Sequence, residues 1–308
     1  MASNEGPDER ELWSSLPHLA GIEKAQAYYQ LSGIAFENGQ FTKSLTLAEE
    51  AKDTFHNVPD DFGYALSVAT VAFCLKSLDR IQDAMSELMK AVLLFTKLGT
   101  KEEWEYRHHL ATWFEESDDF ESALGQYKLC YDNCSYEGDV FGAACDKVNI
   151  GLIYCQMDNC LDAIADFKEA RVVFKKNKDI KRVADMDLFI ARCYNHLKDG
   201  VSAEAFAIKA TSVFDSLCIR DKRAQSYSQL GKAKNLQGEF LAALANYENA
   251  QEFVVACKHV NFYAVYQIQR GKAKALRGLG MVKEAEELEA RNAVINETLE
   301  WERAEIES

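Results

Sequence analysis

Proline and long apolar runs are both scarce in this sequence. Its 308 residues include only three prolines, Pro7, Pro17 and Pro59. Because proline breaks a helix interior, and because Ala, Leu, Glu and Lys are abundant, the composition favours an all-helical protein. No run of about eighteen apolar residues occurs, so we expect no helix that spans a membrane. The polar and acidic first ten residues predict that no signal peptide is present.

Signatures of catalysis are also missing. The sequence contains neither a Gly-x-Ser-x-Gly motif nor a phosphate-binding Gly-x-x-x-x-Gly-Lys-Ser/Thr loop. The six histidines are dispersed, and the adjacent His108 and His109 would point apart on a helix. The Asp118-Asp119 pair falls at a predicted turn, where carboxylates are common for structural reasons. We therefore expect no enzymatic activity and no cofactor.

The cysteines show neither a disulfide framework nor a zinc pattern. They are odd in number and scattered, and none belongs to a Cys-x-x-Cys pair: Cys74, Cys130, Cys134, Cys145, Cys155, Cys160, Cys193, Cys218 and Cys257. Such a set predicts reduced, mostly buried thiols and a cytoplasmic location. Zinc is an alternative at Cys130 and Cys134, one helical turn apart and near His108 and His109. Both cysteines replace apolar residues of the repeat described below, so we predict no metal site.

Charge is unevenly distributed along the chain. The formal net charge is −14, which argues against a general nucleic-acid-binding protein. Residues 101–140 contain eleven Asp or Glu and three Lys or Arg. Residues 221–280 reverse this balance, with nine Lys or Arg and four Asp or Glu. The basic C-terminal region is therefore the part of the chain best suited to an acidic partner.

A pattern of about forty residues recurs along the chain. The position of Gly151 carries a small residue in every copy, at intervals of 40, 39, 40, 40, 40 and 40 residues: Ser32, Ala72, Ala111, Gly151, Ala191, Gly231 and Gly271. Three further ladders keep the same phase: Ser44, Ala84, Ala123, Ala163, Ala203 and Ala243; Ala51, Ala91, Cys130, Ala170, Ala210 and Ala250; and Phe55, Phe95, Cys134, Phe174, Phe214 and Val254. In the seventh copy Ala285 comes two residues late, which predicts a longer turn at Leu279-Gly280.

The small residues predict close helix crossings. Helix axes approach within about 8 Å only where the side chains between them are small. Gly151 and Ala163 therefore predict a helical hairpin, with Tyr154, Phe167 and Phe174 filling the space around its crossing. One hairpin cannot bury its own apolar face, so the copies must stack. A single bundle of long helices is the alternative, but it would show heptads rather than this period.

These residues resemble the tetratricopeptide repeat (TPR). The resemblance rests on Leu230-Gly231, Gly238, Phe240, Ala243, Tyr247 and Ala250 in one copy, and on Ile150-Gly151, Tyr154, Ala163, Phe167 and Ala170 in another. The unit here is longer than usual. It is similar to the arrays of bacterial signalling ATPases and transcription regulators and of kinesin light chains, and residues 217–224 resemble the bacterial connection between repeats. The resemblance is specific for the fold rather than for the function.

The resemblance implies an all-α fold, a right-handed α-solenoid superhelix of about seven TPR-like helix hairpins with a C-terminal capping helix. The array is expected over residues 22–290, divided into 22–58, 61–98, 102–133, 140–176, 180–217, 220–258 and 262–290. We expect a disordered N-terminus over residues 1–11 and a capping segment over residues 12–21. Residues 291–308 are expected to form the acidic end of the C-terminal capping helix.

The resemblance also implies that the first helix of each repeat lines a concave groove. The position after the Gly151 ladder carries Arg192, Lys232 and Lys272 in the last three copies. Asn195 and Asn235 follow three residues later on the same face. Stacked cations with neighbouring amides predict a clamp for the carboxylates and backbone of an extended acidic ligand. A solvated basic face, balanced by the acidic end helix, is the alternative.

The N-terminal part of the expected groove is apolar rather than basic. Tyr29, Phe36 and Phe73 fall on the predicted groove face of the first two repeats. An aromatic surface of this kind suits a helix or a hydrophobic peptide. Alternatively, these side chains pack beneath the N-terminal capping segment. The sequence leaves both interpretations open.

Together these features predict a non-enzymatic scaffold or adaptor that binds a protein or peptide segment, acidic where it meets the C-terminal half of the groove. The alternative is a regulatory sensor subunit whose superhelical pitch changes when a peptide or small ligand binds. The array would act alone, in a homo-oligomer or within a larger complex, since it has no ATP-binding loop and no room for a helix-turn-helix domain. We expect no direct contact with nucleic acid or with a membrane.

Overall fold

The fold is all-α, as the sequence predicts. The structure is a computed structural model, and it describes residues 9–256 and 262–293. Within these ranges the regular secondary structure consists of helices, fourteen α-helices and one 3-10 helix with defined bounds. The chain divides into two compact units, Met1–Cys130 and Tyr131–Ser308. Each unit is described separately below.

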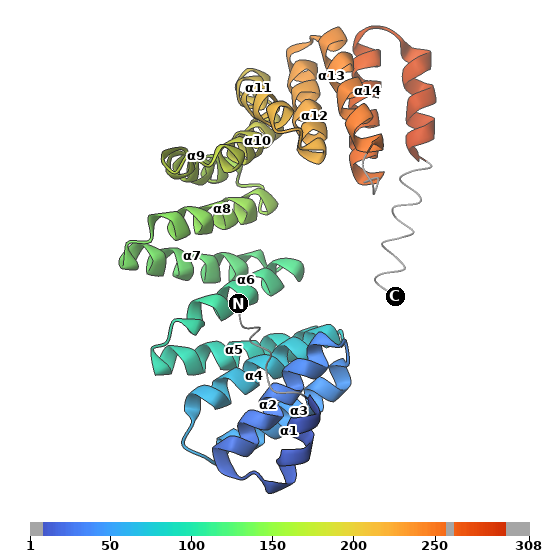
Figure 1. Cartoon of the computed structure of the whole chain (residues 1–308). Helices are drawn as coiled ribbons and strands as arrows, with labels where there is room; N and C mark the ends of the chain where they lie inside the picture. Colours follow the sequence, from blue (N-terminus) through green and yellow to red (C-terminus); the bar gives the residue numbers. More distant parts are fainter. Residues whose placement is uncertain (1–8, 257–261, 294–308) are drawn as a thin grey trace. The chain divides into compact units, whose positions relative to one another are not determined.

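Unit 1 contains helices that pack in sequence order (Figure 1). Their bounds are α1 (Glu9–Ser15), the 3-10 helix η1 (Leu16–His18), α2 (Gly21–Glu37), α3 (Phe41–His56), α4 (Asp61–Ser77), α5 (Ile81–Leu98), α6 (Glu102–Glu116) and the first part of α7 (Phe120–Glu137). The antiparallel pairs α2–α3 and α4–α5 are two of the expected hairpins. Each contacts the next, so the apolar face that one hairpin cannot bury alone is covered by its neighbour.

The N-terminal segment is ordered over more residues than predicted. Residues 9–11, expected to be disordered, form the first turn of α1. Leu12 and Leu16 are buried against Leu31 of α2, and Glu9 forms a 3.0 Å ion pair with Lys43 of α3. The sequence shows the apolar residues but not this ion pair, whose partners are 34 residues apart. Residues 1–8 lie outside the described ranges.

Within unit 2, the helices from α8 onward also pack in sequence order (Figure 1). It contains the end of α7, α8 (Val140–Gln156), α9 (Cys160–Lys176), α10 (Ile180–His196), α11 (Gly200–Ser216), α12 (Arg220–Gln237), α13 (Phe240–Val255) and α14 (Phe262–Gly278). Residues 282–293 are also helical. The expected acidic end of the capping helix falls mostly on residues 294–308, outside the described ranges.

Two details differ from the sequence prediction. α7 extends to Glu137, four residues beyond the expected end of its repeat at residue 133. The late Ala285 does not reflect a longer turn, because residues 279–281 separate two helices just as residues 157–159 do. Instead α14 continues seven residues past Gly271, whereas α8 continues five past Gly151.

The turns inside the repeats share one backbone geometry. One residue in each has a positive φ, between 57° and 80°: Gly39, Asp79, Asp118, Asp158, Lys198, Gly238 and Gly280. The next residue donates its backbone N–H to a carbonyl five residues earlier, as Asn159 does to Tyr154 at 2.8 Å. This is the αL helix end that favours glycine. Two of the helices that follow these turns start at an aspartate whose carboxylate accepts from the helix backbone: Asp119 accepts from the Ser122 N–H and Asp199 from the Ser202 N–H.

The glycine ladder makes room for aromatic rings. A Cβ placed on Gly151 would lie 2.7 Å from Phe167, and one on Gly231 would lie 2.8 Å from Tyr247. Both rings are fully buried, and so are Ala163 and Ala243, one turn earlier on the same two helices. Gly271 also abuts Tyr247, so this ring lies between the helices α12 and α14. The expected close crossings are therefore present. Because glycine has no side chain, it leaves room for an aromatic ring from the second helix of the hairpin.

Candidate functional site

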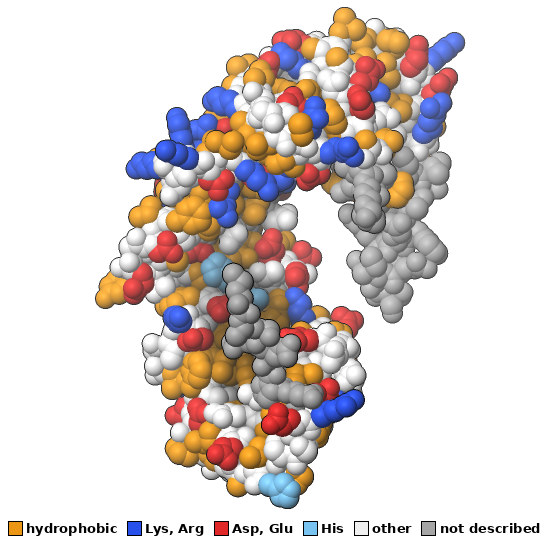
Figure 2. Space-filling model, in the orientation of Figure 1, with side chains coloured by type: hydrophobic (Ala, Val, Ile, Leu, Met, Phe, Trp, Pro, Cys, Tyr) orange, Lys and Arg blue, Asp and Glu red, His pale blue; other side chains and the backbone are white. Residues whose placement is uncertain are grey.

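A cavity of about 350 Å³ opens in unit 2 between α10, α12 and α14. We call it the basic cavity. Its walls are formed by Arg192, Asn195, His196, Gln229, Lys232, Asn235, Leu236, Tyr247, Gln267, Arg270, Gly271 and Lys274. Four of the five residues predicted for a clamp, Arg192, Asn195, Lys232 and Asn235, therefore line one space. On the face drawn in Figure 2, basic side chains are frequent around α9 to α12.

Three cations of this cavity lie close together without acidic partners. In the part of the chain that the structure describes, no ion pair involves Arg192, Lys232 or Arg270. Most other basic residues of residues 221–280 do have such partners, for example Lys222 with Asp185 and Lys234 with Glu204. Burial lowers the pKa of Lys232, and the charges of Arg192 and Arg270 lower it further. An anion in the cavity would relieve this repulsion.

The two asparagines offer hydrogen-bond acceptors to the same space. Asn195 Nδ2 donates to the backbone carbonyl and to Oε1 of Gln229, each at 3.0 Å. Asn235 Nδ2 donates to the Gly271 carbonyl at 2.9 Å. These bonds fix the orientation of both amides and leave their buried Oδ1 atoms without a donor among the described residues. Buried acceptors without a donor are uncommon in folded proteins, so these two amides are exceptional among the polar groups of the cavity wall.

A second cavity, of about 470 Å³, adjoins the first. Arg192, Gln229, Lys232 and Gln267 line both. The remaining wall of this adjoining cavity is largely apolar: Leu188, Phe189, Ala224, Val254, Tyr263, Ala264 and Ile268, with the polar Asp221, Gln225 and Ser228. Arg192 lies over the Phe189 ring, 5.5 Å from its centroid. The two adjoining cavities together therefore present cations beside an apolar hollow.

The third predicted cation does not line either cavity. Lys272 Nζ donates instead to Gln251 Oε1 of α13 at 3.1 Å. Its place is taken by Arg270 and Lys274, on the same helix. The predicted groove face comprised the position after each small ladder residue and the position three residues later. Arg270, directly before Gly271, and Lys274, three residues after it, also line the cavity. The side of α14 that faces the cavity is therefore not the predicted one.

The chain matches no protein-family model. It also matches no curated protein. Solved structures do resemble it. The apo form of RapI is 14% identical, with 90% of this chain and 99% of that chain covered and a TM-score of 0.61. A tetratricopeptide repeat protein from Parabacteroides merdae is 14% identical, with 90% and 97% covered and a TM-score of 0.59. This chain has a TPR fold.

A third similar structure is larger than this TPR array. It is a signal transduction ATPase with a tetratricopeptide repeat sensor from Pyrococcus horikoshii, 18% identical, with a TM-score of 0.57. The match covers 93% of this chain but 46% of that one. At these levels of identity the similarity concerns the fold alone. It agrees with the resemblance of the repeat ladders to the longer TPR arrays.

The aromatic residues predicted for the N-terminal groove lie in unit 1 of the TPR array. Within the described residues, the capping segment packs in a cluster with Leu31 and its neighbours, and that cluster does not include these three aromatic residues. Tyr29 contacts the cluster around Phe55, and Phe36 lies edge-on to Phe41 with centroids 5.3 Å apart. Phe73 lies edge-on to Trp113 and His109, at 5.2 and 4.9 Å. All three are partly buried, and they do not share a described cavity.

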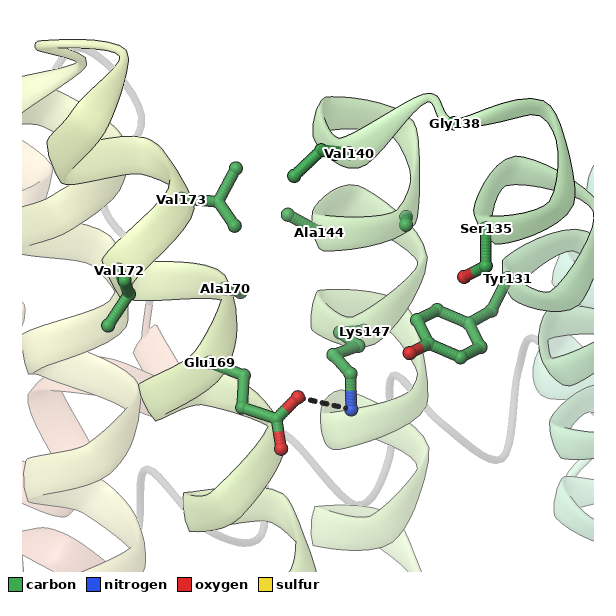
Figure 3. A pocket seen from close by; sticks show the side chains of 11 residues that line it. Tyr131, Ser135, Gly138, Val140, Ala144, Lys147, Glu169, Ala170, Val172 and Val173 are labelled. Atoms are coloured by element: carbon green, nitrogen blue, oxygen red, sulfur yellow. Dashed lines mark ion pairs between the residues drawn. The ribbon is translucent and has the colours of Figure 1, made fainter.

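Another cavity of unit 2, of about 470 Å³, lies beside α7, α8 and α9 (Figure 3). Val140, Ala144, Val172 and Val173 give it apolar walls. The cation in its wall, Lys147, is neutralised by Asp166 at 2.7 Å and Glu169 at 3.0 Å. Figure 3 shows Glu169 pointing toward Lys147, with the Tyr131 ring on the other side. This cavity therefore lacks the unpaired charge that distinguishes the basic cavity.

The TPR array shows no site for a metal in its described parts. Within residues 9–256 and 262–293, no group of three or more His, Cys, Asp and Glu side chains is suited to hold an ion. Cys130, one of the two cysteines considered for zinc, is buried and its Sγ faces the Trp104 carbonyl at 3.9 Å. Among the described helices, none combines the length and apolar character that crossing a bilayer requires.

Proposed function

We propose that the protein is a non-enzymatic scaffold whose basic cavity binds an acidic, extended segment of a partner protein or peptide. The observation that carries the proposal is the set of three unpaired cations, Arg192, Lys232 and Arg270, beside two amide oxygens without donors among the described residues. Carboxylates of the ligand would meet the cations, and its backbone N–H groups would donate to Asn195 and Asn235.

The adjoining cavity adds a requirement for the ligand. Because the two cavities share Arg192 and Lys232, a ligand that fills both carries a bulky apolar side chain near its acidic residues. Burial of such a side chain contributes about 1.5–3 kcal/mol. An exposed ion pair contributes only about 0.2–1 kcal/mol. The apolar contact is therefore expected to supply much of the affinity, and the cations to supply selectivity for acidic sequences.

The test measures fluorescence polarisation of short labelled peptides with Glu at alternate positions, with and without a neighbouring Phe. Lys232→Met and Arg270→Met should each weaken binding of the Phe-containing peptide about tenfold, the equivalent of about 1.4 kcal/mol. Lys175→Met is the matched control, since Lys175 is an exposed residue of α9 outside both cavities. Binding should also weaken with added salt, because the Debye length falls from about 10 Å at 0.1 M to about 3 Å at 1 M.

Equal affinity of Lys232→Met and Lys175→Met, with both variants folded, would show that the cations form a solvated basic face. The variants must therefore be compared by circular dichroism before binding is measured. Lys272→Met provides a further comparison. Because Lys272 is bonded to Gln251 outside the cavity, its replacement should affect binding less than Lys232→Met.

A ligand-responsive sensor is the second candidate function. Its support is that the cavity walls come from α10, α12 and α14, the first helices of three successive repeats. A ligand that contacts all three would alter the rotation between repeats if its bound geometry differs from the free one. The similar ATPase from Pyrococcus horikoshii has a tetratricopeptide repeat sensor. Small-angle scattering with and without the Phe-containing peptide separates the candidates: a changed radius of gyration favours the sensor.

A further inference from the structure

Two cysteine thiols of unit 2 lie in contact. Cys155, near the end of α8, and Cys193, near the end of α10, place their Sγ atoms 3.3 Å apart. They come from the first helices of successive repeats and are 38 residues apart in the sequence. Cys193 is 1% exposed, whereas Cys155 is only partly buried and so can meet a small solute. The pair therefore combines one partly exposed cysteine with one buried cysteine.

The surroundings favour the thiolate form of Cys155. A hydrogen bond from Cys193 and the neighbouring Arg192 guanidinium lower the pKa of Cys155 to about 7. The proximity of Cys155 and burial raise the pKa of Cys193. A thiolate next to a cation and a neutral thiol is the arrangement found in oxidation-sensitive cysteines. Within this pair, Cys155 is therefore the nucleophile and Cys193 the resolving thiol.

The other described cysteines lack this combination. Burial raises the pKa of Cys74, Cys145 and Cys160, and burial together with Asp146 raises that of Cys134 to about 12. Cys218 is exposed and sits at a positive-φ turn position with its Sγ near the Asp215 carbonyl. Cys218 is thus the exposed cysteine of the described residues, which makes it the internal comparison for accessibility alone.

We propose that Cys155 and Cys193 form a peroxide-sensitive thiol pair, oxidised reversibly to a disulfide between α8 and α10. The Cys155 thiolate attacks hydrogen peroxide, the O–O bond breaks, and Cys155 becomes a sulfenic acid as hydroxide leaves and takes up a proton. The Cys193 sulfur then attacks the sulfenic sulfur. The S–S bond forms, the S–O bond breaks, and the Cys193 proton leaves with the hydroxide as water. Two thiols are oxidised and one peroxide is reduced to two waters.

The pair belongs to the same row of side chains as the asparagines of the basic cavity. Cys155, Asn195 and Asn235 occupy equivalent positions in successive repeats, and each contacts the first helix of the next repeat. Asn195 and Asn235 make this connection through hydrogen bonds. Oxidation would replace the corresponding thiol contact by a covalent bond and would remove the thiolate that faces Arg192. The proposal itself does not depend on the identity of the cavity's ligand.

The test exposes the reduced, full-length protein to hydrogen peroxide, blocks the remaining thiols with N-ethylmaleimide and maps disulfides by non-reducing peptide mass spectrometry. The expected product is a Cys155–Cys193 crosslink that dithiothreitol reverses and that forms before Cys218 is modified. Cys193→Ser should trap the sulfenic acid at Cys155, detected with dimedone. Arg192→Met should slow the crosslink several-fold, and Cys218→Ser should leave its rate unchanged.

Three results would overturn the proposal. These are preferential modification of Cys218, a dominant crosslink of Cys155 to Cys160, and survival of both Cys155 and Cys193 as free thiols after Cys218 is oxidised. The disulfides are mapped in the wild-type protein, so the test remains decisive even if Cys193→Ser destabilises the fold. Because no peptide ligand enters the experiment, its outcome is independent of the function proposed for the basic cavity.

Discussion

Replacement of Gly151 by alanine tests the packing of the repeat most directly. The added Cβ would lie 2.7 Å from Cε1 and 3.0 Å from Cδ1 of Phe167. Carbon atoms prefer about 3.5–4.0 Å, so the ring would have to retreat by almost 1 Å. It has little room, because it is fully buried and its centroid lies 5.3 Å from that of Phe189.

The expected net effect of Gly151→Ala is a loss of about 0.5–2 kcal/mol. Overpacking costs about 1–3 kcal/mol. Alanine in a helix interior recovers about 0.5–1 kcal/mol relative to glycine. Gly33→Ala is the matched control, since Gly33 lies inside α2 and a Cβ there would meet nothing within 4 Å. The same chemical change should therefore stabilise at Gly33 and destabilise at Gly151.

Amide hydrogen exchange read by mass spectrometry is the suitable assay, because Gly33 and Gly151 lie in different units and need not unfold together. Exchange should accelerate in α8 and α9 of Gly151→Ala and slow in α2 and α3 of Gly33→Ala. Combining Gly151→Ala with Phe167→Leu should cost less than the sum of the single changes. Stabilisation by Gly151→Ala comparable to that by Gly33→Ala would refute the close crossing.

Three other outcomes follow from described contacts. Lys198→Gly should raise the melting temperature, because Lys198 has φ 62° and a left-handed conformation costs a lysine about 1–2 kcal/mol. The greater conformational entropy of glycine in the unfolded chain offsets part of this gain. An unchanged or lower melting temperature would contradict the prediction. Arg171→Leu should destabilise by about 3 kcal/mol in urea unfolding, because Asp187, 2% exposed and bonded to Arg171 at 2.7 Å, would lose its counter-charge. Acidic-peptide binding should decline as pH rises through the pKa of Lys232, which lies below the usual 10.5, since only the protonated amine attracts a carboxylate; constant polarisation up to pH 10.5 would exclude a role for Lys232.

The repeat and its packing could be predicted from the sequence because the ladders record repeated steric requirements. Gly151 and Ala163 are small where helices cross, and the phenylalanines recur where the crossing needs filling. The phase of these ladders also located the hairpin turns. The extension of α14 could not be recognised, because a two-residue shift of Ala285 is equally consistent with a longer turn and a longer helix.

The site was only partly predictable. Arg192, Asn195, Lys232 and Asn235 follow from extending one helix face through successive repeats. Arg270 could not be predicted in this way. The basic cavity lies between α10, α12 and α14, and the side chains that a helix directs toward the preceding repeat differ from those that it directs toward the following one. The contact of Cys155 with Cys193 escaped for the same reason, since its spacing of 38 residues joins non-equivalent positions and forms no ladder.

The shared geometry of the turns makes the repeats interchangeable segments of chain. Each hairpin turn has its αL residue at the same place and the same closing hydrogen bond, whatever side chain it carries. Removal of residues 160–199 would join Asn159 to Gly200 and put Ala203 where Ala163 now lies, with the αL turn at Asp158 kept. Duplication of the same segment would preserve these relations equally well. A gain or loss of two residues would instead rotate the rest of a helix by about 200°. Arrays of this kind can therefore lengthen or shorten by whole repeats, and the number of binding positions can change while each one keeps its local structure.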